Sequence, residues 1–369
     1  MFLLFSLAVS ATAALQADRG LLDFGAFYMA GVIQEEGLNP YGVCPDLAAE
    51  TGENFGHEDG RGHSPNLNPP ISLYPLRLLA DGDPGDVKMA LNVTSAIVFA
   101  GCALAMLRAY PQHRTLQGLL WVAAFGGFWY TLWLGQVYVL LFVLGLGAWF
   151  LIQRGTHPLV AGLMIGLLVA VKPHFALWPL FLLLAGHPRI ALASFVTAGA
   201  ISAVPLLLEG PGIYRQWLDA VQAYPRVGLA GNASIVGQAE RLGLIEAGYV
   251  ISAALVVAAG FVMWRSRATA VGASAWGIVV ALLASPIAWI GYGLLAMPVL
   301  LTRRWEALEW CAAAGMTGVW FVIGRGEPFL AASFVLLYLL IKDQLVQRDL
   351  TLSVDEARTR SARRQSIAA

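Results

Sequence analysis

Long apolar runs recur along this chain almost from its first residue to position 342. A helix needs about 20 such residues to cross a hydrocarbon core of about 30 Å. The chain is 58% hydrophobic and only 12% charged, whereas soluble domains contain roughly 25% charged residues. Because backbone groups inside a bilayer must be hydrogen-bonded within the protein, the sequence predicts an all-α polytopic membrane protein.

The apolar runs predict about twelve membrane spans, within a range of about 10–13. Their expected positions are 1–16, 87–107, 116–134, 137–152, 158–171, 174–186, 190–208, 247–264, 271–284, 287–301, 308–323 and 328–342. The pieces within 158–186 and 271–301 are shorter than about 17 residues, so we expect broken or tilted helices there. The first span lacks a Lys or Arg in front of it, which favours a retained span over a cleaved signal peptide.

Charged residues divide unequally between the two sides of these spans. Short connections that alternate along the chain carry arginine, at Arg108, Arg154, Arg189, Arg265 and Arg303. The opposite side receives the two long connections, 17–86 and 209–246. The positive-inside rule then puts these two loops outside the cytoplasmic membrane. We therefore predict a single membrane domain, residues 1–342, followed by a cytoplasmic basic tail, residues 343–369.

The first long loop carries local structure of its own. The apolar spacing from Phe24 to Ile33 predicts a short amphipathic helix at the membrane interface, ended by Gly37. Residues 68–80 contain prolines that forbid a regular span, and they predict a second interfacial element. The polar, glycine-containing residues 50–65 predict a mobile surface excursion.

Polar side chains converge on the external side of this topology. They are Asp23, Tyr28, Gln136, Lys172, His174, Asn232, Ser234, Arg241 and Ser285. A lysine at the bilayer centre costs roughly 2.5–3.5 kcal/mol on insertion scales, so Lys172, which lies between two apolar runs, requires an explanation. The convergence predicts a binding site on the external face, in which Lys172 holds an anion.

Each of the main candidates also has a plainer interpretation. Lys172 could extend its ammonium to the interface. Asp23 could cap the helix that follows it. His174 could be a packing residue, Gln136 could satisfy backbone groups at a span end, and Trp289 could anchor the chain at the membrane interface.

We predict neither a metal site nor a disulfide framework, and no cofactor. His57 and His63 are not accompanied by a clustered set of ligands. The cysteines Cys44, Cys102 and Cys311 lie far apart in the sequence.

Several segments, taken in order, carry a resemblance to a known family. They are "DFGAFYMAG", "GLNPYG", "NPPISLYPL", "GQVYVLLFVLGLGAWF", "LVAGLMIGLLVAVKPHFALWPLFLLL", "GNASIVG" and "SPIAWIGYGLLAMPVLL". Together they cover most of residues 20–301. The chain resembles the polyprenyl-phosphate-mannose-dependent glycosyltransferases of family 87, which have the integral-membrane GT-C fold. The resemblance implies transfer of a sugar, with mannose favoured, from a polyprenyl-phosphate donor to a lipid or glycan acceptor.

The same resemblance implies a place and a catalytic base for this reaction. The site would face the external side of the cytoplasmic membrane, and Asp23 would take the proton of the acceptor hydroxyl. A leaving phosphate needs positive charge, for which Lys172, His174 and Arg241 are the candidates. Further substrate contacts are expected from Tyr28, Tyr41, Gln136, Asn232, Ser234, Ser285 and Trp289. Membrane lipid is an expected partner, and nucleic acid is not.

Two other classes of function remain open at this point. A secondary transporter or lipid flippase would also have about twelve spans with broken helices, but its charged residues would lie near the bilayer midplane. A non-catalytic membrane assembly subunit would share these sequence features and would differ only in lacking activity.

Overall fold

The computed structural model describes residues 1–16, 21–50, 64–78, 80–223 and 227–346. Within these residues the secondary structure is helical, apart from two isolated β-bridges. The prediction of an all-α polytopic membrane protein is confirmed. Most of the expected mobile excursion, with His57 and His63, and most of the basic tail lie outside the described residues.

The helices follow one another along the chain with short interruptions. They are α1 (Phe2–Gln16), α2 (Leu22–Glu35), α3 (Pro45–Glu50), α4 (Leu73–Arg77), α5 (Pro84–Ala109), α6 (Leu116–Ala123), α7 (Gly126–Leu134), α8 (Tyr138–Gln153), α9 (Pro158–Val171), α10 (Leu177–Leu184), α11 (Pro188–Glu209), α12 (Gly212–Ala223), α13 (Ile235–Arg241), α14 (Ile245–Ser266), α15 (Ala270–Ala284), α16 (Met297–Leu301), α17 (Ala307–Gly315) and α18 (Trp320–Ile323). A last helix runs over Glu327–Val346. Short 3-10 turns cover Pro70–Ser72, Pro111–His113, Pro173–Ala176 and Ile290–Ala296.

Four of the described helices are long and apolar enough to cross a membrane: α5, α11, α14 and Glu327–Val346. The other expected spans are shorter apolar helices or helices in two pieces. The prediction of one continuous span at 116–134 and at 308–323 is wrong, because each of these runs is divided. The run at 287–301 contains one short apolar helix, Ile290–Leu301, as expected for a piece too short to cross upright.

Two of the divided runs satisfy each other's backbone groups. Between α6 and α7, the N–H of Gly126 donates to the carbonyl of Met316 over 2.9 Å, and in return Gly318 donates to Ala124 over 3.0 Å. A Cβ on Gly126 would lie 2.5 Å from the carbonyl oxygen of Thr317, so only glycine permits this approach. Irregular backbone at membrane depth is stable only when its polar groups are paired, and this β-bridge pairs them.

Helix α9 packs against α11 through small residues. A Cβ on Gly162 would lie 2.6 Å from the carbonyl oxygen of Ile190, and one on Gly166 would lie 2.6 Å from that of Ser194. Such close backbone contact is the usual means of helix association in lipid, where apolar side chains gain little from leaving the solvent. The packing fixes the C-terminal end of α9 and therefore the residue that follows it, Lys172.

The predicted helix in the first long loop is confirmed as α2. It ends before Gly37, whose φ of +70° is the left-handed conformation that glycine adopts freely. Its apolar stripe is buried: Phe24 and Ile33 are both fully enclosed. At Gly31, α2 meets α4, since a Cβ there would lie 2.7 Å from the carbonyl oxygen of Leu76.

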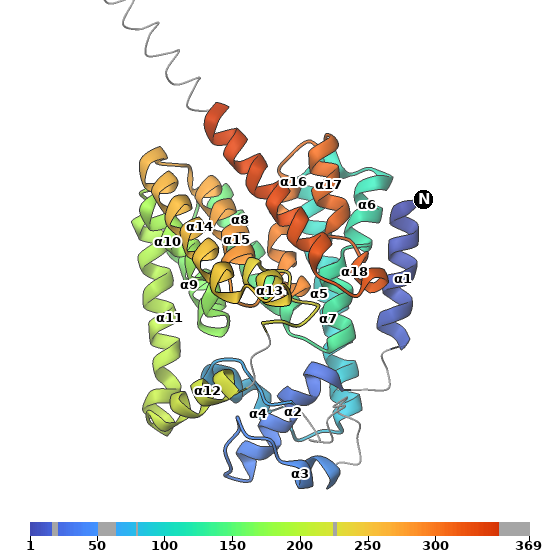
Figure 1. The fold of residues 1–369 in the computed structure, drawn as a ribbon, viewed down its shortest axis with the longest axis vertical. Coiled ribbons are helices and arrows are strands. Elements are labelled where there is room, and N and C mark those ends of the chain that lie inside the picture. The colour runs from blue at the N-terminus through green and yellow to red at the C-terminus, as the bar shows by residue number, and fades with distance from the viewer. Residues whose placement is uncertain (17–20, 51–63, 79, 224–226, 347–369) are drawn as a thin grey trace, which may run out of the picture.

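The two ends of the helical bundle differ in what they carry (Figure 1). The N-terminus and the end of the helix Glu327–Val346 lie at one end, and α2, α3, α4 and α12 gather at the other. At the first end the basic connections meet, since His113 Nε2 lies 2.9 Å from the carbonyl oxygen of Arg303. Both long loops thus contribute helices to the end opposite the N-terminus and Val346, as the charge pattern predicts. Which end faces the cytoplasm stays a prediction.

Candidate functional site

A pocket of about 520 Å³ lies where the helices of the long loops meet the bundle. Its wall is built from α2, residues 65–69, the turn 136–138, residues 171–174, α12, Val227, Tyr249 and residues 285–292. Its volume is within the range of about 300–1,000 Å³ that is usual for small-molecule sites. Six of the side chains expected at the site line it: Asp23, Gln136, Lys172, His174, Ser285 and Trp289.

Asp23 enters the pocket from the first turn of α2. The N-cap position of this helix is Leu21, which makes no side-chain cap. The Asp23 carboxylate instead accepts a hydrogen bond at Oδ2 from Nε2 of Gln136, over 2.7 Å. The interpretation of Asp23 as the N-cap residue of α2 is therefore wrong.

Gln136 reaches Asp23 because of the turn that ends α7. Gly135 has a φ of +67°, and a Cβ at this position would lie only 2.7 Å from Cβ of Phe24. A residue with a side chain would therefore be both strained and obstructed here. The other amide atom of Gln136, Oε1, is buried and has no hydrogen-bond partner among the described residues.

Lys172 lies in the connection between α9 and the next 3-10 turn. Pro173 follows it and disfavours the helical conformation for the preceding residue, so Lys172 leaves the helix with φ −132° and ψ 82°. Its side chain does not extend to the surface, since the residue is only 7% exposed. The ammonium Nζ lies 5.3 Å from the ring centre of Tyr138 and 5.4 Å from that of Tyr292.

Burial lowers the pKa of the Lys172 ammonium to about 8, and the nearby Asp23 carboxylate opposes this shift. Among the described residues that line the pocket, Asp23 and Lys172 are the ones with charged side chains, and His174 is titratable. The pocket therefore combines one carboxylate and one ammonium in surroundings that are mostly apolar.

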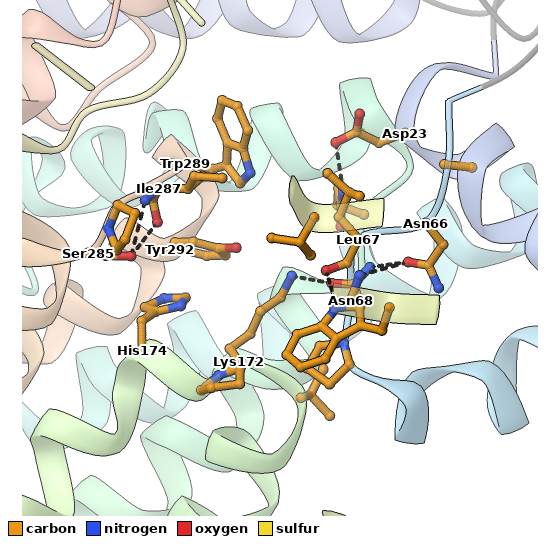
Figure 2. A pocket seen from close by; sticks show the side chains of 18 of the residues that line it. Asp23, Asn66, Leu67, Asn68, Lys172, His174, Ser285, Ile287, Trp289 and Tyr292 are labelled. Atoms are coloured by element: carbon orange, nitrogen blue, oxygen red, sulfur yellow. Dashed lines mark hydrogen bonds between the residues drawn. The ribbon is translucent and has the colours of Figure 1, made fainter. Parts of the chain in front are cut away.

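Asn68 is the hydrogen-bond partner of Lys172, and sequence reasoning missed it. Its Oδ1 lies 2.6 Å from Nζ of Lys172, and Figure 2 shows the lysine side chain extending toward this amide. The pattern Asn66-Leu67-Asn68 before two prolines is a local signal for a turn in which Asn66 bonds the backbone two residues on. Nothing in the sequence connects that turn with a lysine more than a hundred positions away.

An aromatic side of the pocket is formed by His174 and Tyr292, and the Phe175 ring packs against both of them. The His174 ring lies 4.3 Å from the ring of Phe175 and 4.7 Å from that of Tyr292, between centres. Its Nε2 is buried without a hydrogen-bond partner among the described residues. His174 thus packs against rings and also lines the pocket.

The segment after α15 completes this wall. Pro286 lies directly after Ser285 and ends the helix in the same way that Pro173 ends α9. The Ser285 hydroxyl donates to the carbonyl of Ile287 over 2.7 Å, which holds a tight turn. Trp289 then lines the pocket.

Asn232 and Ser234 lie behind this wall and are not among the lining residues. The Asn232 amide donates to the carbonyls of Val227 and Pro286 and accepts from the N–H of Ala288 over 2.9 Å. Ser234 donates to the same Pro286 carbonyl over 3.2 Å and caps α13. Their polar groups join the second long loop to the wall segment.

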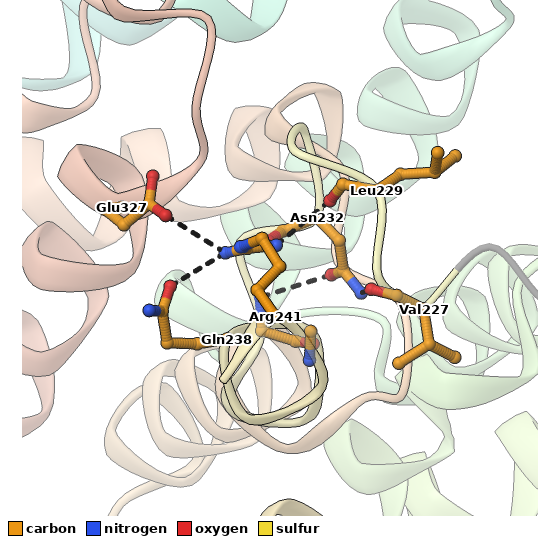
Figure 3. A network of polar contacts seen from close by, with 8 residues as sticks. Val227, Leu229, Asn232, Gln238, Arg241 and Glu327 are labelled. Atoms are coloured by element: carbon orange, nitrogen blue, oxygen red, sulfur yellow. Dashed lines mark hydrogen bonds and ion pairs between the residues drawn. The ribbon is translucent and has the colours of Figure 1, made fainter. Parts of the chain in front are cut away.

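Arg241 supports the same junction from α13 and is also absent from the lining. Its guanidinium donates to the carbonyls of Leu229 and Asn232, each over 3.0 Å. It also lies 3.4 Å from the carboxylate of Glu327, at the start of the last helix, and it bonds Gln238. Figure 3 shows the side chain at the centre of these contacts.

Tyr28 and Tyr41 are buried close to the site but do not line it. The Tyr28 hydroxyl donates to the carbonyl of Gly82 over 3.2 Å. The Tyr41 hydroxyl donates to the backbone carbonyl of Asn68 over 3.1 Å. For these two tyrosines, as for Asn232, Ser234 and Arg241, direct contact with a substrate stays a prediction.

The comparisons with known proteins give one match. The model of glycosyltransferase family 87 matches residues 66–286, which is more than half of the chain. No curated protein and no solved structure matches it. The matched range includes Lys172 and Asn68, and Asp23 and Trp289 lie outside it.

Proposed function

Because the chain belongs to glycosyltransferase family 87, and is therefore a membrane glycosyltransferase, we propose that it transfers a sugar from a polyprenyl-phosphate donor to a hydroxyl of a lipid or glycan acceptor. Mannose is the sugar that we favour. The observation that carries the proposal is the pocket itself. The oriented carboxylate of Asp23 and the buried ammonium of Lys172 both line it.

Asp23 is the general base of the proposed reaction. It takes the proton of the acceptor hydroxyl as the oxygen attacks the anomeric carbon and the bond from that carbon to the phosphate oxygen breaks. The hydrogen bond from Gln136 supports this role, because it holds the carboxylate plane in one orientation. Among the described residues that line the pocket, Asp23 is also the one that carries a carboxylate.

Lys172 holds the phosphate of the donor in this proposal and balances the charge that grows on it as it leaves. A sugar linked to a prenyl chain through one phosphate carries a single negative charge, and one ammonium matches it. A pyrophosphate-linked donor would bring more charge than this lysine can balance. The charge of the pocket therefore favours a monophosphate donor.

The sugar and the wall of the pocket complete the assignment. Trp217, Trp289 and Tyr292 line the pocket with ring faces of the kind on which a sugar can stack. We assign Asn232, Ser234 and Arg241 to the support of this wall, since their polar atoms bond backbone groups behind it. We place the site on the external side of the cytoplasmic membrane, because the arginine-bearing connections lie at the other end of the bundle.

Transfer by the purified protein tests the proposal. The protein, in lipid nanodiscs, is incubated with mannosyl phosphate on a polyprenol, with the sugar labelled, and with lipid and glycan extracts as acceptors. We expect label in a lipid or glycan product, and no transfer when a nucleotide-linked mannose replaces the donor. Lys172→Met should abolish transfer, and Lys342→Met, at an exposed lysine of the last helix, is the matched control. Transfer from the nucleotide sugar, or none from the lipid-linked donor by folded protein, would refute the proposal.

A further inference from the structure

We propose that Asn66 and Asn68 form a positioning relay that holds the Lys172 ammonium in place and leaves its positive charge available to the donor phosphate. This inference rests on the proposed function and adds two residues to it. Asn68 Oδ1 accepts from Lys172 Nζ over 2.6 Å. Asn66 stands behind Asn68, and it is only 1% exposed.

The contacts of Asn66 determine which way the Asn68 amide faces. Asn66 Oδ1 accepts two hydrogen bonds from Asn68, one from its backbone N–H over 3.0 Å and one from Nδ2 over 2.8 Å. An amide group that donates through Nδ2 on one side presents its oxygen on the other side. Asn66 therefore turns the Asn68 oxygen toward Lys172, and a reversed amide would place two N–H donors against an ammonium.

Two further hydrogen bonds hold the backbone of this segment. Tyr41, from the first long loop, donates to the carbonyl of Asn68 over 3.1 Å. Trp217, from α12 in the second long loop, donates through Nε1 to the carbonyl of Leu67 over 3.0 Å. The relay is therefore fixed from both long loops, and both of these carbonyls belong to the turn that presents Asn68.

The neutrality of the amide is what connects the relay with an anionic ligand. A buried ammonium is usually paired with a carboxylate, which cancels its charge. Here the atom within hydrogen-bond distance is a neutral oxygen, which occupies one of the three N–H groups of the ammonium and favours its protonated form. The remaining N–H donors stay available in the pocket, where Asp23 is the carboxylate whose charge acts on the ammonium. A phosphate oxygen is a ligand that can use both these donors and the positive charge of the ammonium.

Variants of Asn68 separate this role from general support of the fold. The leucine variant Asn68→Leu removes the acceptor, and the aspartate variant Asn68→Asp keeps an acceptor but cancels the charge. Binding of a synthetic mannosyl phosphate with a short prenyl chain is measured from neutral to alkaline pH. We expect the leucine variant to bind about tenfold more weakly, and to lose binding at a lower pH than the wild type. The aspartate variant should bind poorly throughout this range.

A second readout does not depend on the donor. Titration of the Lys172 amine, followed by NMR of protein labelled in its lysine side chains, should move to lower pH in Asn68→Leu and to higher pH in Asn68→Asp. Asn66→Ala acts one residue further away. It should also move the titration of the Lys172 amine to lower pH, but by less than Asn68→Leu does. Asn92→Leu is the control, because Asn92 bonds the carbonyl of Leu132 and does not line the pocket.

The outcomes distinguish the relay from the proposed function. An unchanged lysine titration in a folded Asn68→Leu protein would overturn the relay, whatever happens to donor binding. Equal loss of binding at every pH, with no shift of the titration, would show that Asn68 only supports the fold. If the titration shifts as expected but the wild type does not bind the mannosyl phosphate, then the phosphate role of Lys172 fails and the hydrogen-bond relay stands.

Discussion

Gln136 Nε2 donates a hydrogen bond of 2.7 Å to Oδ2 of Asp23, across 113 positions of sequence. It connects the turn after α7 with the first turn of α2, and both turns depend on backbone geometry. Gly135 makes the first turn possible, and α2 begins one residue before Asp23. The carboxylate is therefore oriented by the protein before any substrate binds.

Replacement of Asp23 by asparagine should abolish transfer and leave the fold intact. Asparagine keeps an oxygen that can accept from Gln136, but it cannot take a proton from the acceptor. Loss of a general base typically lowers the rate by about 10²–10⁴-fold. Transfer of labelled sugar measures the effect, with thermal unfolding as the check on folding. If the well-folded variant transferred sugar at a near-normal rate, Asp23 would have no part in the mechanism.

Replacement of Gln136 by alanine should lower kcat by a smaller factor and leave KM for the donor nearly unchanged. The hydrogen bond to a charged group is worth about 1.5–3 kcal/mol, which corresponds to about 10–100-fold in rate if it orients Asp23 during the reaction. Gln112→Ala is the matched control, because Gln112 bonds the carbonyl of Leu301 far from the pocket. Equal rates for the two variants would show that Asp23 needs no orientation by Gln136.

Donor binding should decrease as the pH rises through about 8, the value to which burial lowers the pKa of Lys172. Below this pH the amine is protonated and attracts the phosphate, and above it the amine is neutral. Arginine remains charged throughout, so binding by Lys172→Arg should vary little between about pH 7 and 9, even if it is weaker. Donor titrations at several pH values give the comparison. A wild-type affinity that is constant over this range would contradict the assignment of Lys172 to the phosphate.

Replacement of Gly166 by alanine should destabilise the protein, because its Cβ would lie 2.5 Å from Cβ of Thr197 and 2.6 Å from the carbonyl oxygen of Ser194. Overpacking of this kind costs about 1–3 kcal/mol. A Cβ on Gly199 of α11 would have no other atom within 4 Å, so Gly199→Ala is the control. Thermal unfolding in detergent compares them. Identical Tm values for the two variants would mean that α9 and α11 can move apart to admit a methyl group without loss of stability.

Cysteines at Leu38 and Arg304, both exposed residues, should label from opposite sides of the membrane in a background without native cysteines. The charge pattern puts Leu38 outside and Arg304 in the cytoplasm. A membrane-impermeant thiol reagent added to intact cells should therefore modify only the first. If only the cysteine of Arg304→Cys were modified, the protein would have the opposite orientation in the membrane.

The order of the apolar runs predicts which polar residues lie together better than it predicts where the spans break. The sidedness of the loops brought Asp23, Gln136 and Lys172 together on one face, and the structure places all three around one pocket. This was possible because alternation of sides along a membrane protein needs only the order of the apolar runs. It says nothing about side-chain direction, which is why the sequence could not show that Arg241 bonds backbone groups behind the pocket wall.

Breaks within spans could not be predicted from hydropathy. The residues around Ala124 and Thr317 are as apolar as a continuous span requires, and each break is stable only because the other supplies its hydrogen bonds. The Asn68 contact was missed for a similar reason. Its partner is determined by the packing of α9 on α11, which brings Lys172 to it, and not by any local pattern.

The wide sequence separation of the pocket contacts has a consequence for biosynthesis. Lys172 meets its partner across 104 positions, and Trp217 meets Leu67 across 150. Because synthesis proceeds from the N-terminus, Asp23 is made well before the opposite wall of the pocket, which ends at Tyr292. Domains and loops that are made early must wait for such late partners. The pocket is therefore complete only after Tyr292 has been made, and a nascent chain that stalls earlier has inserted helices but no complete pocket.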